Sequence, residues 1–96
     1  MTVKESFNVA GLRTTWGIPE AKGYRAREDA LIVSRVRAAG AVILGKTNTP
    51  EFGAGANTFN EVFGPTRNPW DTSRSAAGSS GGAAVALATG TAWLAH

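Results

Sequence analysis

One segment constrains the fold most: the charged, periodic stretch "EDALIVSRVRAA", which is followed by a glycine and the apolar run "AVIL". Acidic residues open the stretch and arginines lie near its end, as the helix dipole favours. Ile32, Val36 and Ala39 fall at i, i+4 and i+7, on one apolar face. These features predict a helix over residues 28–39. Gly40 would cap it, because glycine readily takes the left-handed conformation of a C-cap.

The remaining elements are predicted as strands and a second helix. Residues 41–44 form a short run rich in branched side chains between two glycines, which predicts a buried strand. A helix is predicted over residues 83–88, capped by Ser79 or Ser80 and ended by Gly90. The stretches "TVKESFNV" and "TAWLAH" predict strands near the two ends of the chain. Helices alternating with strands place the chain in the α/β class.

Residues 46–76 predict a long irregular region. They hold three of the four prolines and many Asn, Thr and Gly residues. A loop of this length inside a compact domain is usually functional or conceals short elements.

Composition excludes several kinds of site. The ten Lys and Arg residues give a net charge of only +3 and form no run, which argues against a nucleic-acid surface. There is no cysteine, and the single His96 is terminal, so no transition-metal site is expected. No apolar run approaches the ~20 residues of a membrane span, and no signal peptide is recognisable. We therefore expect a cytoplasmic protein without a metal or cofactor.

The stretch "GAVILGKT", Gly40 to Thr47, fits the phosphate-loop pattern G-x-x-x-x-G-K-[ST]. In a phosphate loop the four variable residues curl around the phosphates and a helix begins at the lysine. Here those four residues are apolar and favour a strand, and Asn48 and Pro50 disfavour a helix. Nucleotide binding is therefore an alternative that the surrounding sequence opposes. Lys46 is interpreted as a strand-end lysine or a loop anchor.

The stretch "AGSSGGAAVALATG" contains the best candidate for a chemical site. Two serines between glycines, leading into a helix, bring together hydroxyls, free backbone N–H groups and close backbone approach. Such groups can polarise a carbonyl. The alternative, a flexible linker, is opposed by the helix that follows.

The ordered motifs of the chain resemble the amidase signature family. They are K-[DE] in "VKESFNVAGLRTTWG", then G-K-T-N, E-F, G-P-T-R-N-P and G-S-S-G-G. The resemblance covers nearly the whole chain. It implies a mixed β-sheet sandwiched between helices. Residues 1–96 would then be part of an amidase signature domain, incomplete at both ends.

The resemblance also implies a mechanism and its residues. The family hydrolyses carboxylic amides through a Ser–Ser–Lys triad and an acyl-serine intermediate. Lys4 matches the catalytic lysine, and Ser79 matches the bridging serine, which the family holds beside a cis peptide. Ser80 matches the serine that supports the lysine, and Gly78 suits the cis geometry. A lysine can act as the base where burial lowers its pKa from about 10.4.

Other implications of the resemblance concern the substrate and the missing groups. The turn of Gly53, Ala54 and Gly55 is a candidate lining of the acyl pocket. The nucleophilic serine would belong to a later motif, so the 96 residues alone are expected to be inactive. Ala77 stands where the family commonly has glycine, which is tolerable if its φ is negative.

The expected partners follow from the same resemblance. They are a small-molecule amide substrate and the remainder of the chain's own polypeptide, with no nucleic acid and no membrane. Association of copies into a homo-oligomer is left open, as is the choice between a free amidase and a component of an amidotransferase. A non-catalytic remnant or interaction module is the alternative function, because an exposed sheet edge would favour association.

Overall fold

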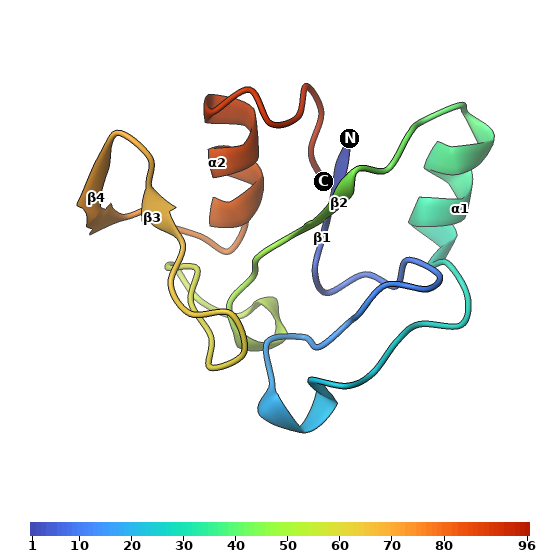
Figure 1. Ribbon diagram of the computed structural model, residues 1–96, viewed down its shortest axis with the longest axis horizontal. Helices are drawn as coiled ribbons and strands as arrows, with labels where there is room; N and C mark the ends of the chain where they lie inside the picture. The colour runs from blue at the N-terminus through green and yellow to red at the C-terminus, as the bar shows by residue number, and fades with distance from the viewer.

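The computed structural model describes residues 1–96, the whole chain. Its regular elements are short and follow one another in this order: β1 (Thr2–Lys4), the 3-10 turn η1 (Pro19–Ala21), α1 (Leu31–Ala38), β2 (Gly45–Thr47), the 3-10 turn η2 (Glu51–Gly53), β3 (Arg67–Asn68), β4 (Asp71–Ser75) and α2 (Gly81–Ala88). Figure 1 shows β1 and β2 at the centre, near both chain ends, with α1 and α2 to either side.

The central sheet is parallel and places β1 in its middle. β1 pairs with β2 so that Lys4 lies opposite Thr47. On its other side β1 meets the end of the chain, where Thr2 and Ala95 form a parallel bridge. The strand predicted in "TAWLAH" is therefore reduced to one bridge.

The two faces of β1 carry different side chains because neighbouring residues in a strand point to opposite faces. Val3 packs with Val9 and with Val33 of α1 in the small hydrophobic core. Lys4 points the other way and reaches the serines that precede α2. The two helices therefore cover opposite faces of the sheet, and the predicted α/β layering is confirmed.

Helix α1 begins later than predicted and buries a different residue. It starts at Leu31, after Ala30 in an extended conformation, so Asp29 lies outside the helix. The Asp29 carboxylate accepts a hydrogen bond from the Ala10 amide at 2.7 Å and pairs with Arg37. This pairing holds the preceding loop against the helix.

The apolar face predicted for α1 is wrong. Val33 is its only buried residue, whereas Ile32 is 40% exposed and Ala39 is exposed. The positions of Val3 and Val9 decide which side of α1 enters the core. The spacing of apolar residues along the helix does not reveal those positions. The cap is confirmed, since Gly40 has a φ of 88°.

The buried strand predicted at residues 41–44 is also wrong. These residues have no regular structure, and Val42 and Leu44 are 71% and 63% exposed. The strand begins at Gly45, where pairing with Thr2 begins. Before that point only Met1 lies alongside, bonded to Val42 and Leu44.

The long region 46–76 conceals short elements. It contains η2 and an exposed two-stranded hairpin of β3 and β4. In Figure 1 the hairpin lies beside α2, away from the central strands.

Helix α2 follows the prediction, and both α-helices are short. It runs from Gly81 to Ala88, and Gly90 ends it with a φ of 70°. Ser80 occupies the N-cap position but makes no capping hydrogen bond. No helix has the length and apolar character that crossing a bilayer requires.

Candidate active site

Lys4 is positioned by the central sheet. It is the last residue of β1, and the next residue, Glu5, donates its amide to the carbonyl of Thr47 at 2.9 Å. This hydrogen bond and the pairing of Lys4 with Thr47 therefore hold the lysine backbone against β2. Its side chain leaves the sheet toward the N-terminus of α2.

Ser79 and Ser80 lie in the turn that leads into α2. The peptide bond between Gly78 and Ser79 is cis, as the resemblance implies. Ala77, before this bond, has a φ of 58°, so the condition of a negative φ for this alanine is not met. The turn closes tightly enough to place both serine hydroxyls toward β1.

The structure brings Lys4 and both serines together. The Lys4 ammonium donates to the hydroxyl of Ser79 at 2.7 Å and to the hydroxyl of Ser80 at 3.1 Å. Burial lowers the pKa of Lys4 from its ordinary value. No protein group accepts the hydroxyl hydrogen of Ser79, so this oxygen can accept from Lys4 and donate to another group. The cluster can therefore accept and pass on a proton.

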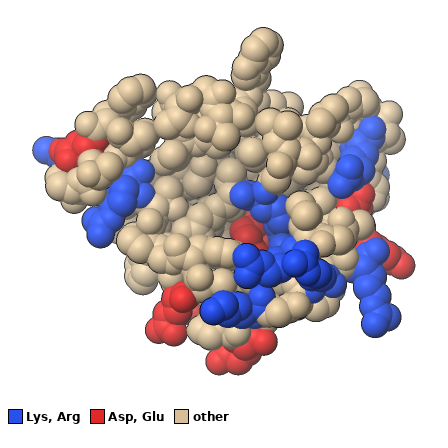
Figure 2. Space-filling view, viewed as in Figure 1, with Lys and Arg blue, Asp and Glu red and all other residues tan.

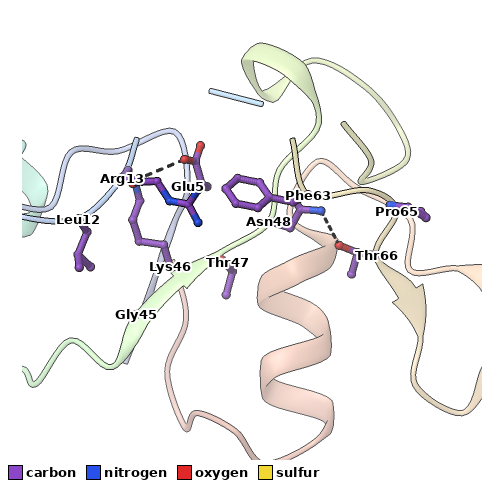
Figure 3. Close-up of a pocket in the computed structure, with 10 residues that line it drawn as sticks. All are labelled: Glu5, Leu12, Arg13, Gly45, Lys46, Thr47, Asn48, Phe63, Pro65 and Thr66. Atoms are coloured by element: carbon purple, nitrogen blue, oxygen red, sulfur yellow. Dashed lines mark hydrogen bonds and ion pairs between the residues drawn. The ribbon is translucent and has the colours of Figure 1, made fainter. Parts of the chain in front are cut away.

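The largest pocket lies elsewhere, along β2. It has a volume of about 490 Å³ and contains neither Lys4 nor Ser79. Figure 3 shows the polar side chains of Glu5, Lys46 and Asn48 among those that line it. Lys46 and Asn48 are already used within the chain: Asn48, for example, donates to Thr66 at 3.0 Å. Glu5 accepts from Thr15 through one oxygen, and its other oxygen has no partner. We therefore place the candidate site at Lys4, where free hydroxyl hydrogens remain.

Lys46 anchors a loop and does not bind a phosphate. Its ammonium donates to the carbonyl of Arg13 at 2.6 Å and to the hydroxyl of Thr14 at 2.7 Å. It lies within a strand, and the residues that follow do not begin an α-helix. The phosphate-loop interpretation of Gly40 to Thr47 is therefore wrong, because Lys46 already donates hydrogen bonds within the chain and no α-helix begins after it.

The remaining predicted residues lie outside the Lys4 cluster. Gly53 closes η2, and Ala54 and Gly55 follow in an exposed turn. None of them lines the largest pocket. Their role in an acyl pocket stays a prediction. No group of three or more His, Cys, Asp or Glu side chains could hold a metal ion.

Sequence analysis missed two groups that support the site. Thr58 is 1% exposed and contacts the turn that carries Ser79. No feature of the neighbouring sequence distinguishes Thr58 from the other threonines. Glu5 is 4% exposed and pairs with Lys46. The sequence did contain a clue to Glu5, since a carboxylate directly after a buried strand requires a partner.

Comparison with known proteins gives the family. A family model described as Amidase matches residues 1–96. The chain belongs to the amidase family. The chain is 50% identical over 88 residues to a glutamyl-tRNA(Gln) amidotransferase subunit of Acidothermus cellulolyticus, a match that covers 92% of the chain and 17% of that protein. The corresponding protein of Treponema pallidum (strain Nichols) is 51% identical over 88 residues, with the same shares.

Solved structures agree in fold. The chain superposes on the glutamyl-tRNA(Gln) amidotransferase subunit of Thermotoga maritima with a TM-score of 0.92 and 39% identity, over 98% of this chain and 21% of that one. It superposes on 6-aminohexanoate cyclic dimer hydrolase with a TM-score of 0.91 and 45% identity, over 98% and 20%. The chain thus spans about a fifth of the length of these structures, and its fold is that of the corresponding part.

Proposed function

We propose that the polypeptide containing this chain hydrolyses the C–N bond of carboxylic amides through an acyl-serine intermediate. Lys4 is the base in this proposal and Ser79 is the bridging serine. The observation that supports it is the 2.7 Å contact between Lys4 Nζ and Ser79 Oγ, made by a lysine whose pKa is lowered by burial. A lysine can remove a proton only in its neutral form, so this shift favours the proposed role.

The proposed reaction begins with a proton relay. Neutral Lys4 takes the hydroxyl proton of Ser79, while the Ser79 oxygen takes the proton of a nucleophilic serine. That serine attacks the amide carbonyl and forms the acyl-serine. The proton returns through the same relay to the leaving nitrogen as the C–N bond breaks. Water then attacks the acyl-serine and gives its proton to the same relay, and the proton returns to the serine oxygen as the C–O bond breaks and the acid is released.

Ser80 and Gly78 support the relay in this proposal. The Ser80 hydroxyl accepts a second hydrogen bond from Lys4, which fixes the direction of the ammonium. Gly78 has no side chain, and an added Cβ would lie 2.9 Å from the hydroxyl oxygen of Thr58. The turn of Gly53, Ala54 and Gly55 is proposed as part of the acyl pocket. No step requires a metal or a cofactor.

The nucleophile and much of the substrate site are assigned to the remainder of the polypeptide. Large apolar side chains are uncovered in this chain: Trp93 is 96%, Trp70 is 78% and Val42 is 71% exposed. Such side chains favour contact with further protein. Basic residues gather on one part of the face in Figure 2, but acidic residues lie beside them, so this face is not the uniformly basic surface typical of nucleic-acid binding.

A chimera tests the proposed function. Residues 1–96 replace the matching segment of 6-aminohexanoate cyclic dimer hydrolase, with which they share 45% identity. Hydrolysis of 6-aminohexanoate cyclic dimer is then measured for the chimera and for its Lys4→Met and Ser79→Ala variants. We expect an active chimera and a loss of about 10²-fold or more in kcat for each variant, because general acid–base groups contribute on this scale.

Two controls complete the experiment. The free 96-residue chain should give no turnover, since the proposal places the nucleophile outside it. Ser6→Ala changes a serine that makes no side-chain hydrogen bond in the structure and should leave kcat unchanged. A folded, active chimera in which Lys4→Met retains full kcat would rule out the assigned base.

A further inference from the structure

Thr58 holds both ends of the turn that carries Ser79. Its side chain is buried, with 1% of the residue exposed. The hydroxyl donates to the carbonyl of Ala77 at 2.9 Å and accepts from the amide of Gly81 at 3.0 Å. A hydroxyl has one hydrogen to donate, so its donor is fully used. The three residues between Ala77 and Gly81 are thus closed into a loop by one oxygen atom.

The same oxygen excludes side chains at the two glycines of the turn. A Cβ added to Gly78 would lie 2.9 Å from Thr58 Oγ1, and one added to Gly81 would lie 2.6 Å from it. Both distances are shorter than a carbon can approach without displacing its neighbour. The glycines of "GSSGG" and the hydroxyl of Thr58 are therefore parts of one packed arrangement.

The backbone fixes Thr58 itself. Its amide donates to the carbonyl of Ala77 at 3.0 Å, and its carbonyl accepts from the amide of Thr66 at 2.8 Å. The hydroxyl is therefore presented from a backbone that is bonded on both sides. Movement of the turn relative to Thr58 would break bonds that no water can easily replace at a buried residue.

We infer that Thr58 is a positioning residue, which holds the Ser79 hydroxyl within hydrogen-bond distance of Lys4 by binding Ala77 and Gly81 at once. The inference deepens the proposed function, since it concerns the same lysine and serine. Thr58 touches neither of them through a hydrogen bond. It acts through the turn, whereas the sheet positions Lys4.

The test removes the hydroxyl and keeps the shape. Thr58→Val in the 96-residue chain replaces the hydroxyl with a methyl group of similar size. Two NMR quantities are measured: the titration midpoint of Lys4 Nζ and the exchange rate of the Gly81 amide hydrogen. We expect the Lys4 midpoint to move upward, toward that of free lysine, because the released turn no longer buries the ammonium. The Gly81 amide should exchange about tenfold faster, as one lost hydrogen bond predicts.

Two matched variants isolate the hydroxyl. Thr58→Ser keeps the hydroxyl and should restore both quantities to their original values. Thr49→Val makes the same change at a threonine that is 0% exposed but whose hydroxyl has no partner. It should move neither quantity. A folded Thr58→Val chain with an unchanged Lys4 midpoint and unchanged Gly81 exchange overturns the inference, and so does a Thr49→Val chain that shifts both equally.

A measurement on the unsubstituted chain covers the case in which Thr58→Val does not fold. A cross-peak between the Thr58 hydroxyl hydrogen and the Gly81 amide hydrogen supports the inference. A hydroxyl hydrogen that exchanges with water as freely as that of an exposed threonine overturns it. These readouts need no catalysis, so an inactive chimera would defeat the proposed function and leave the positioning result standing.

Discussion

The ammonium of Lys46 lies 3.9 Å from the carboxylate of Glu5, and these side chains are only 7% and 5% exposed. Glu5 also accepts a hydrogen bond from the amide of Thr15. The pair therefore fastens the segment around residues 13–15 to the ends of β1 and β2. Glu5 directly follows Lys4 in the sequence, and the pair lies on the face of the sheet away from α2.

Loss of one partner of this pair is expected to be costly. Glu5→Gln should lower the free energy of unfolding by about 3 kcal/mol at pH 7, because it leaves a buried ammonium without its counter-charge. Urea denaturation measures the change. Arg74→Gln breaks the exposed pair between Arg74 and Asp71 and serves as the control, with an expected loss of at most about 1 kcal/mol. Equal losses for the two variants would show that the Glu5 pair is not effectively buried.

Stability should rise with pH in the alkaline range because of Lys46. Burial lowers its pKa from 10.5 to about 8, and Glu5 opposes part of that shift. Between these values the unfolded chain binds a proton that the folded chain does not, so the free energy of unfolding increases as the pH rises. The gain should approach about 3 kcal/mol by pH 10.5.

The comparison for this pH effect is Lys46→Met. Its free energy of unfolding should rise less over the same interval, since only Lys4, whose pKa is also lowered, then contributes in this direction. Urea midpoints at half-unit pH steps provide the data. Parallel curves for the two chains would contradict the assignment to Lys46.

Ala77→Gly should stabilise the chain. Ala77 has a φ of 58°, a region that costs an alanine about 1–2 kcal/mol and glycine little. Part of the gain is offset by the greater freedom of glycine in the unfolded chain, so we expect a net gain of about 0.5–1 kcal/mol. Thermal unfolding measures it. Ala76→Gly changes the neighbouring alanine, whose φ is not positive, and should destabilise the chain instead.

Gly82→Ala should destabilise the chain although alanine favours helices. An added Cβ would lie 2.5 Å from the amide nitrogen of Asn48, in the backbone just after β2. Helix α2 would have to move away from the strand, at a cost of about 1–3 kcal/mol. Gly23→Ala adds a methyl group where no atom lies within 4 Å and should change stability by less than about 0.5 kcal/mol. Similar effects of both substitutions on the urea midpoint would argue against this contact.

Local signals in the sequence were sufficient for the features that depend on neighbouring residues. The glycine cap at Gly40 and the end of α2 at Gly90 follow from short-range backbone preferences. The motifs around Lys4 and Ser79 were sufficient for the family, because several ordered motifs coincide. Their assigned roles remain predictions.

Tertiary structure decided the features that depend on distant partners. Residues 41–44 have the composition of a strand, yet β2 begins only at Gly45, which lies opposite Thr2. Val33, and not Ile32, enters the core because Val3 and Val9 lie on that side of α1.

The sequence by itself determined the α/β class, the glycines that end the two helices and the identity of the candidate lysine and serines, since short-range backbone preferences and motif order express these directly. Only the tertiary structure decided that Lys4 and Ser79, 75 residues apart, meet at 2.7 Å. It also decided that a buried threonine closes the serine turn. Contacts between distant residues depend on how strands pair and helices pack, and no local pattern encodes that geometry.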